Sequence, residues 1–327
     1  MKKIVPILMI TLILFGCPDY EFEYETIIID TPTNLEKLNT EYDDYNSDLP
    51  YFSGGHQIYF SSNRNSSGGN FDIIVKAIEM SYHDRDNILN FSIPTIGSYT
   101  SFQSKLLPII NTPNDELGPF SFSGTQGWDY FFYANNESGD FNTKFVYTPR
   151  LDWGTYDGQK RLYGPNNVTL INSEFDDLYP TIHEDNSKLL FCSNRENDLF
   201  DIYSVDLDAE ILLHDNLMNE NSVQISKETV LSSASNDKCP SIMDNLIVFA
   251  SDKEGGYGGY DLYYSQFKNN QWSNPINFGE KINSVNDEYR PITFSFASFN
   301  LLIFSSNRPG GQGGFDLYCV KISETLN

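Results

Sequence analysis

Short apolar and aromatic segments recur along the chain and are separated by polar turns rich in glycine and asparagine. The clearest is 302–308 (LIFSSNR), which is followed after a glycine-rich turn by 315–318 (FDLY). Segments of this length and composition are typical of β-strands, and the turns are typical of hairpins. No stretch after the N-terminal region keeps an apolar period of 3.6 residues with helix caps. The pattern therefore predicts an all-β protein.

A ten-residue pattern that starts Ile-Asn-Ser and ends in proline occurs four times, and a looser copy precedes them. Each copy is followed by a segment like Phe-Ser-Ser-Asn-Arg and then by one like Phe-Asp-Leu-Tyr. We number these repeats one to five by their first residues, which are Leu38, Ile110, Ile171, Leu231 and Ile282. The starts lie 51 to 72 residues apart. Since a propeller blade needs about 40–45 residues, each step holds one blade. We predict a five-bladed β-propeller of four-stranded blades.

The last repeat stops after its third strand, near Ile322, whereas segment 25–30 resembles a spare strand centred on three isoleucines. We expect a closing strand at about 25–37 to complete the last blade and remove an exposed sheet edge. Region 78–104 is irregular, and we interpret it as an insertion in the outer part of the first blade. Trp153 and Trp272 lie near the start of fourth strands, where we expect them to anchor the packing.

The N-terminus has the features of a secretory signal. Lys2 and Lys3 precede an apolar run, 4–15, that is too short for a membrane span of about 20 residues. The run ends in LFGC, which resembles the lipobox of bacterial lipoproteins; an ordinary signal peptide with a chance cysteine is the alternative. We predict a signal peptide at 1–16, a tether at 17–24 that is lipidated (palmitate) at Cys17, and one propeller at 25–327.

Acidic residues follow Cys17 closely, and stretches of this kind resemble surface-export signals of some lipoproteins. We expect a lipid anchor in the bacterial outer membrane, with the periplasmic and the surface-exposed face both open. Without residues 1–16 the chain has 19 basic and 45 acidic residues, a net charge of −26. This charge excludes binding to nucleic acid, which requires clustered Lys and Arg. Cys192, Cys239 and Cys319 are expected to be buried thiols, in a monomer.

A basic residue precedes an acidic one by six or eight positions in four of the repeats, and a hairpin would bring the two together. We predict four structural ion pairs: Arg64 with Asp72, Arg195 with Asp201, Lys253 with Asp261, and Arg308 with Asp316. The second repeat has Asn136 at the basic and Lys144 at the acidic position, so it lacks the pair. Loss of both partners together is what a structural role predicts.

An acidic residue also precedes the expected innermost strand of every blade. These residues are Asp44, Glu116, Asp177, Asp237 and Glu288. In a propeller they would surround one mouth of the central channel, where carboxylates are able to bind a hard cation such as calcium. They are equally able to bond their own backbone amides in turns. We favour the turn interpretation, because no loop has the dense Asp spacing of known calcium motifs.

The signature Phe-Ser-Ser-Asn-Arg followed by Phe-Asp-Leu-Tyr resembles the WD40-like repeat of TolB-type propellers, which occur in the bacterial envelope. The resemblance covers the chain from about Leu38 onward. It implies a propeller fold and, by analogy with TolB, an interaction with another envelope component through one face of the ring.

No motif of a serine hydrolase elbow, a zinc protease or a phosphate loop is present. The acids recur with the repeat, whereas a catalytic set should be unique to particular blades. We therefore expect a non-enzymatic interaction module without a cofactor, which binds an envelope protein, a peptide or a glycan. The alternative is a glycan-active propeller hydrolase that uses channel-lining carboxylates.

Overall fold

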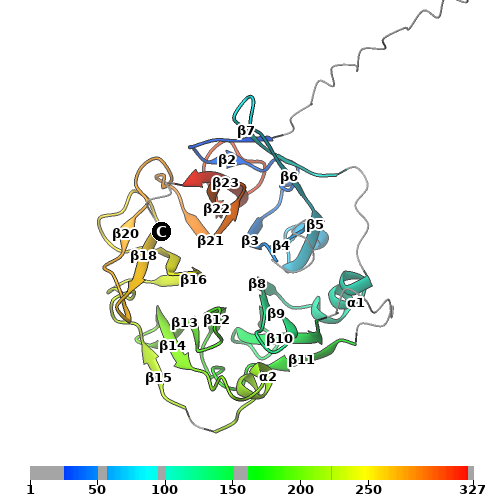
Figure 1. Cartoon of the computed structure of the whole chain (residues 1–327), viewed down its shortest axis with the longest axis vertical. Coiled ribbons are helices and arrows are strands. Elements are labelled where there is room, and N and C mark those ends of the chain that lie inside the picture. Colours follow the sequence, from blue (N-terminus) through cyan, green and yellow to red (C-terminus); the bar gives the residue numbers. More distant parts are fainter. Residues whose placement is uncertain (1–25, 51–56, 95–100, 151–160, 222, 323–327) are drawn as a thin grey trace, which may run out of the picture.

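The computed structural model describes residues 26–50, 57–94, 101–150, 161–221 and 223–322. Within these ranges the protein consists almost entirely of antiparallel strands, in sheets arranged around a common centre like the blades of a propeller (Figure 1). The all-β prediction is confirmed. Cys17, Trp153 and the predicted signal and tether segments lie outside the described residues. No helix among the described residues is long and apolar enough to cross a membrane.

Each repeat contributes one sheet whose first strand is innermost (Figure 1). The first repeat forms β3 (Asp44–Asp48), β4 (Gln57–Ser62) and β5 (Asp72–Ala77). The second forms β8 (Glu116–Ser123), β9 (Trp128–Asn135), β10 (Asn142–Pro149) and β11 (Tyr163–Asn167). The third forms β12 (Asp177–Ile182), β13 (Lys188–Glu196), β14 (Leu199–Asp206) and β15 (Ile225–Lys227).

The last two repeats follow the same plan. The fourth forms β16 (Asp237–Met243), β17 (Leu246–Ser251) and β18 (Asp261–Lys268), and β18 also pairs with β19 (Gln271–Trp272) and β20 (Ile276–Asn277). The fifth forms β21 (Glu288–Phe296), β22 (Phe299–Ser306) and β23 (Asp316–Ile322). Its fourth strand is β2 (Thr33–Asn34), in which Thr33 lies opposite Cys319.

The isoleucine-rich N-terminal segment pairs mainly with another sheet and not, as expected, with the last repeat. It forms β1 (Thr26–Ile28), which pairs with β7 (Ile88–Ser92) in a three-stranded sheet completed by β6 (Glu79–His83). Ile28 is fully buried and packs in one cluster with Leu89 and Phe91, so burial of this side chain explains the pairing. Region 78–104 is therefore an ordered hairpin in part. The N-terminal segment also reaches the last repeat, since Lys321 N of β23 donates to Ile29 O at 3.0 Å and Thr33–Asn34 pair with the same strand.

Two short helices were not predicted. Helix α1 (Ser101–Ile110) packs Leu106 and Ile110 against Val75, and α2 (Leu213–Leu217) buries both of its leucines in the core between the second and third repeats. A single turn of 3₁₀-helix spans Arg64–Ser66. Helices of five and ten residues leave few positions for an apolar period to be recognised, and Pro108 within α1 argued against a helix.

The hydrophobic core is divided into clusters that lie between neighbouring sheets. Phe132 of β9 packs with Phe191 of β13 in one of them, and Phe60 of β4 packs with Ile303 of β22 in another. Trp272 is buried beside Phe267, which agrees with its predicted packing role. Cys192, Cys239 and Cys319 are free and buried, as predicted.

Candidate functional site

The asparagine of the Ile-Asn-Ser pattern links each sheet to the preceding one. Asn283 accepts a hydrogen bond from Leu262 N at 2.8 Å through Oδ1 and donates one to Leu262 O at 3.1 Å through Nδ2. Asn39 makes the same two contacts with Leu317, at 2.9 and 3.0 Å. Asn111, Asn172 and Ser232 hold the equivalent positions. The motif thus supplies a side chain that completes the backbone hydrogen bonding of a neighbouring third strand.

The five acids predicted at the channel mouth are turn residues. Each is fully buried and accepts a hydrogen bond from the backbone amide four residues earlier. The donors to Asp44, Glu116, Asp177, Asp237 and Glu288 are Thr40, Thr112, Ser173, Ser233 and Ser284, at 2.5–3.1 Å. These carboxylates therefore do not line an open channel. Among the described residues no group of three or more His, Cys, Asp or Glu is placed to hold a metal ion, so the calcium alternative gains no site there.

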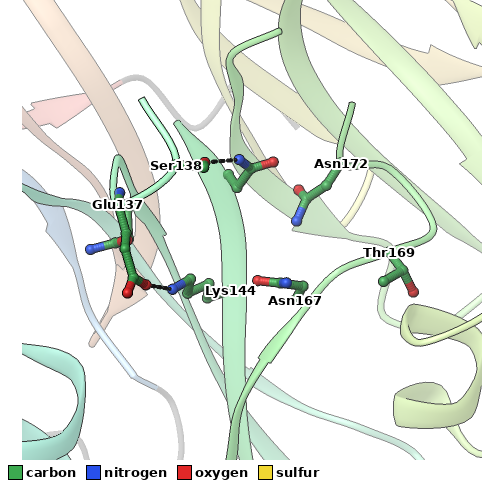
Figure 2. A pocket seen from close by; sticks show the side chains of 8 residues that line it. Glu137, Ser138, Lys144, Asn167, Thr169 and Asn172 are labelled. Atoms are coloured by element: carbon green, nitrogen blue, oxygen red, sulfur yellow. Dashed lines mark hydrogen bonds and ion pairs between the residues drawn. The ribbon is translucent and has the colours of Figure 1, made fainter. Parts of the chain in front are cut away.

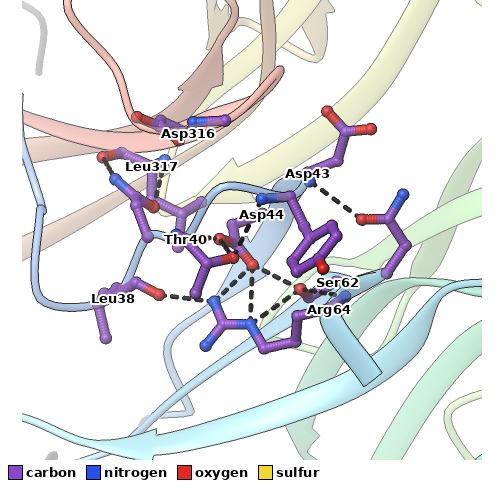
Figure 3. Close-up of polar contacts among 12 residues, drawn as sticks. Leu38, Thr40, Asp43, Asp44, Ser62, Arg64, Asp316 and Leu317 are labelled. Carbon is purple, nitrogen blue, oxygen red and sulfur yellow. Dashed lines mark hydrogen bonds and ion pairs between the residues drawn. The ribbon is translucent and has the colours of Figure 1, made fainter. Parts of the chain in front are cut away.

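The predicted ion pairs have the wrong acidic partner. Arg308 Nη2 lies 2.8 Å from Glu288 Oε1, and Arg195 Nη2 lies 2.6 Å from Asp177 Oδ1. Arg64 contacts Asp44 in the same way, and it also donates to Leu38 O at 2.6 Å (Figure 3). In each case the guanidinium pairs with the buried carboxylate, because that carboxylate has lost its hydration and its negative charge needs a compensating positive charge.

The acids that were assigned to these arginines and to Lys253 have other partners. Asp316 accepts from Asn34 Nδ2 at 2.9 Å, and Asp261 accepts from Asn277 Nδ2 at 2.8 Å. Asp201 pairs with Lys227 and Asp72 accepts from Asn65. Lys253 places its ammonium 3.8 Å from the centre of the Tyr263 ring. In the third, fourth and fifth repeats the fourth strand therefore partners the acid of the third strand.

The second repeat departs from this plan. Its strand register also shows that the residue aligned with the arginines of the other repeats lies one position later than the sequence suggested. Asn135 lies opposite both Glu116 and Asn142, as Ser306 lies opposite Glu288 and Asp316. Glu137 therefore occupies the arginine position and Asn142 the aspartate position. The sequence-based choice of Asn136 and Lys144 was wrong, because two consecutive asparagines fit the signature in either register.

The residues at these positions of the second repeat also replace a stacked pair, one basic and one aromatic side chain, that the later repeats share. In those repeats the basic residue stacks on the aromatic ring two positions after the aspartate, as Arg308 does over Tyr318 at 5.1 Å. Arg195 over Tyr203 and Lys253 over Tyr263 do the same. In the second repeat Lys144 stands at the aromatic position and forms an ion pair with Glu137, with Nζ 2.7 Å from Oε2.

A pocket of about 320 Å³ lies where the stacked pair is missing (Figure 2). Amides, hydroxyls and the Glu137–Lys144 pair line it: Asn135, Glu137, Ser138, Asn142, Lys144, Asn167, Thr169 and Asn172. Asn167 occupies the position that Asn34 and Asn277 hold in other repeats, but its acid partner is replaced by Asn142. The side-chain amide of Asn167 consequently makes no hydrogen bond to any residue that the structure describes. The pocket offers donors and acceptors suited to a hydroxyl-rich ligand.

Two glutamates contact Asn135, and the pKa values of their carboxyl groups are shifted in opposite directions. Glu116 is buried, and burial raises its pKa to about 7. The hydrogen bond and the charge of Lys144 lower the pKa of Glu137, whose side chain is exposed. Asn135 Nδ2 donates to Glu116 Oε1 at 2.7 Å, and Asn135 Oδ1 accepts from Glu137 N at 2.9 Å. The Asn135 side chain therefore contacts the carboxyl of Glu116, whose pKa is raised, and the backbone of Glu137, whose carboxyl pKa is lowered.

The raised pKa of Glu116 predicts a pH-dependent stability. The folded state holds the proton up to about pH 7, whereas the unfolded chain loses it near pH 4.3. Folding stability is therefore lost as the pH rises through this window, at about 1.4 kcal/mol per unit. We expect Glu116→Gln to gain about 3 kcal/mol relative to the wild type between pH 5 and pH 8, measured by urea unfolding. Glu288→Gln, which deprives Arg308 of its partner, should be destabilised at both values. A pH-independent effect of Glu116→Gln would contradict the assignment.

Comparison with known proteins yields structural matches only. No family model matches the chain, and no curated protein matches it. One matching solved structure is the endo-arabinase from Bacteroides thetaiotaomicron, 12% identical, which covers 91% of this chain and 98% of that chain with a TM-score of 0.52. Another is the catalytic domain of the Coprinopsis cinerea GH62 α-L-arabinofuranosidase, 10% identical, with coverages of 92% and 96% and a TM-score of 0.51. These likenesses show a shared fold.

The same matches correct three expectations from the sequence. The two structures named above are glycoside hydrolases and not TolB-type lipoproteins. The predicted TolB-like family is therefore wrong, and the non-catalytic interaction module is overturned with it. The expectation that the chain is not an enzyme is also wrong, since these neighbours are enzymes.

Proposed function

We propose that this protein is a glycan-active hydrolase whose site is the pocket of the second repeat. One observation carries the proposal: a polar pocket whose lining departs from the repeat pattern holds the Glu137–Lys144 ion pair, and Asn135, which also lines it, bonds the buried Glu116 carboxyl. Catalytic residues should be unique to particular blades, and the Glu137–Lys144 pair meets that condition, whereas Glu116 holds a position at which every repeat has an acid. The fold shared with an endo-arabinase and an α-L-arabinofuranosidase supports the same class of reaction.

The two carboxyl groups suit the two roles in glycoside hydrolysis. The reaction needs a protonated carboxyl to release the leaving oxygen and an ionised one to act as base or nucleophile. Groups whose environments push their pKa values apart identify such roles. Glu116, with a pKa of about 7, is the acid, and Glu137, held ionised by Lys144, is the base or nucleophile. Asn135 covers Glu116, so its amide turns aside when a glycan binds.

The amide side chains provide the recognition. Asn142 and Asn167 lie on adjacent third and fourth strands and face the pocket, where they bind sugar hydroxyls. A rigid sheet positions these groups more precisely than a loop would.

We also infer that the ring has five blades and is closed by the N-terminal segment. Three contacts support closure between the fifth and first repeats. Asn39 bonds Leu317 as Asn283 bonds Leu262, Thr33 of β2 pairs with β23, and Phe60 packs against Ile303. Closure fixes the spacing between sheets, and hence the shape of the pocket between the second and third repeats.

The experiment is an activity screen with matched variants. The purified chain is incubated with arabinose-containing polysaccharides, and with glucans and mannans for comparison, and the release of reducing ends is measured. We expect Glu137→Gln to lower kcat at least 100-fold on the substrate that is cleaved, because it removes the ionised carboxylate. Glu174→Gln, an exposed turn residue of the third repeat, serves as the control and should keep full activity. Release by Glu137→Gln at the wild-type rate, or none by the wild type on any polymer, would contradict the proposal.

A further inference from the structure

All five innermost strands are bulged at the same position. The residue there has a left-handed backbone: φ is 58° at Asn46, 59° at Gly118, 54° at Tyr179, 57° at Cys239 and 48° at Arg290. The register of each inner strand shifts at this point. Only glycine adopts this conformation without strain, and a bulge redirects a side chain. Four of the five residues are not glycine, so the chain tolerates backbone strain at these positions in exchange for the direction that the bulge gives their side chains.

The inner strands surround a common centre (Figure 1), and bulged residues of different repeats contact one another. Asn46 Nδ2 donates to the Tyr179 hydroxyl at 3.2 Å, although the two belong to the first and third repeats. The Arg290 guanidinium lies 5.1 Å from the centre of the Tyr179 ring and donates to Pro119 O at 3.2 Å. A β-carbon on Gly118 would come within 2.3 Å of the same ring. We call Asn46, Tyr179 and Arg290, with the nearby Asp48, the axial cluster.

Arg290 is a buried cation with an incomplete set of partners. It is 1% exposed, its Nε has no hydrogen-bond partner among the described residues, and it has no carboxylate within ion-pair distance there. Arg64, Arg195 and Arg308, by contrast, each contact a buried carboxylate. A buried charge without a direct counter-charge is strongly unfavourable. This position is therefore built for a group of opposite charge.

The neighbouring groups also favour an anion. The Tyr179 hydroxyl accepts from Asn46, so its own hydrogen remains to be donated. Burial keeps the pKa of Tyr179 well above its usual value, and it also raises the pKa values of the Cys192 and Cys239 thiols. All three are uncharged at neutral pH, and so is Tyr289, whose pKa burial also raises well above its usual value. Asp48, whose charge interacts with that of Arg290, is the acid near the cluster that titrates close to neutral pH.

Asp48 makes the charge of the cluster depend on pH. Its carboxylate accepts from Ser121 N at 3.0 Å, and burial raises its pKa to about 7. Below that pH Asp48 is neutral, and the positive charge of Arg290 is then uncompensated. Above it Asp48 is negative and offsets Arg290 from a distance.

We propose that the axial cluster is a binding site for a small monovalent anion, of halide or carboxylate type, held by Arg290 Nε and the Tyr179 hydroxyl. The site is separate from the pocket of the second repeat and does not depend on the glycan function. Affinity rises as the pH falls through about 7, because protonation of Asp48 removes the competing negative charge.

The test is the ³⁵Cl NMR line width of sodium chloride in the presence of the full protein, at pH 6 and pH 8. We expect excess broadening that saturates with chloride, is displaced by acetate, and is several-fold stronger at pH 6. Arg290→Met should abolish it. Arg308→Met is the matched control and should keep the broadening, since it removes a guanidinium that is partly buried and lies outside the axial cluster.

The wild-type measurement keeps the proposal falsifiable even where Arg290→Met fails to fold. Arg290→Lys offers a second variant, which keeps the charge but loses the Nε donor and should bind chloride several-fold more weakly. Two wild-type results would overturn the proposal: broadening that does not saturate with chloride, and broadening that does not change between pH 6 and pH 8. Broadening of wild-type strength in Arg290→Met would overturn it as well. Displacement by acetate but not by nitrate would assign the site to carboxylates rather than to small anions in general.

Discussion

Replacing Arg308 by alanine should lower the free energy of unfolding by about 3–5 kcal/mol, because it leaves Glu288 fully buried without its counter-charge. The effect is measured by urea unfolding at neutral pH. A double-mutant cycle should give a coupling energy of at least about 1 kcal/mol between Arg308 and Glu288.

The cycle between Arg308 and Asp316 is the control. These two residues were paired from the sequence, but Asp316 is held by Asn34 and by the backbone amide of Gln312. Their effects should add. Strong coupling of Arg308 to Asp316, with none to Glu288, would contradict the pairing described here.

Asn39→Ala should cost about 2–3 kcal/mol, because it strips the buried Leu317 N–H and C=O of their partner. Asn283→Ala removes the equivalent link between the fourth and fifth repeats, and its loss of stability is the reference with which that of Asn39→Ala is compared. Equal losses in the two variants, measured by thermal or urea unfolding, would mean that the contact between the fifth and first repeats is as strong as an internal one. A negligible effect of Asn39→Ala beside a large effect of Asn283→Ala would exclude ring closure.

The repeat pattern predicted the sheets well, because strand segments and turns are local features. The acid that begins each inner strand, such as Asp177, was correctly interpreted as a residue that bonds the backbone of its own turn, since its donor Ser173 is only four positions away. The role of Asn283 was missed for the opposite reason. Its partner Leu262 is 21 positions away on another sheet, and sequence spacing does not show which sheets adjoin.

The arginine partners were misassigned for a related reason. Arg308 and Asp316 are the two ends of one hairpin, whereas Glu288 lies on the strand to the other side of Arg308 and is 20 positions away. Which of the two carboxylates attracts the guanidinium depends on burial, and burial becomes known only in the folded protein.

The pocket was hidden by a one-residue ambiguity. Two asparagines, Asn135 and Asn136, fit the Ser-Asn signature in either register, so Glu137 was not recognised at the arginine position. The sequence did contain a signal: a glutamate at the arginine position and a lysine near the aspartate position invert the charges of the repeat. A repeat that breaks its own pattern in several positions at once is a better guide to a specific site than the residues that the repeats share.

The most direct measurement of the proposed function is a crystal structure of Glu137→Gln soaked with an oligosaccharide of the polymer that the wild type cleaves. The account predicts a sugar in the pocket of the second repeat, with hydroxyls bonded to the side chains of Asn142 and Asn167 and the scissile oxygen near Glu116 and Gln at position 137. A sugar bound only elsewhere on the ring, with this pocket unchanged, would contradict it.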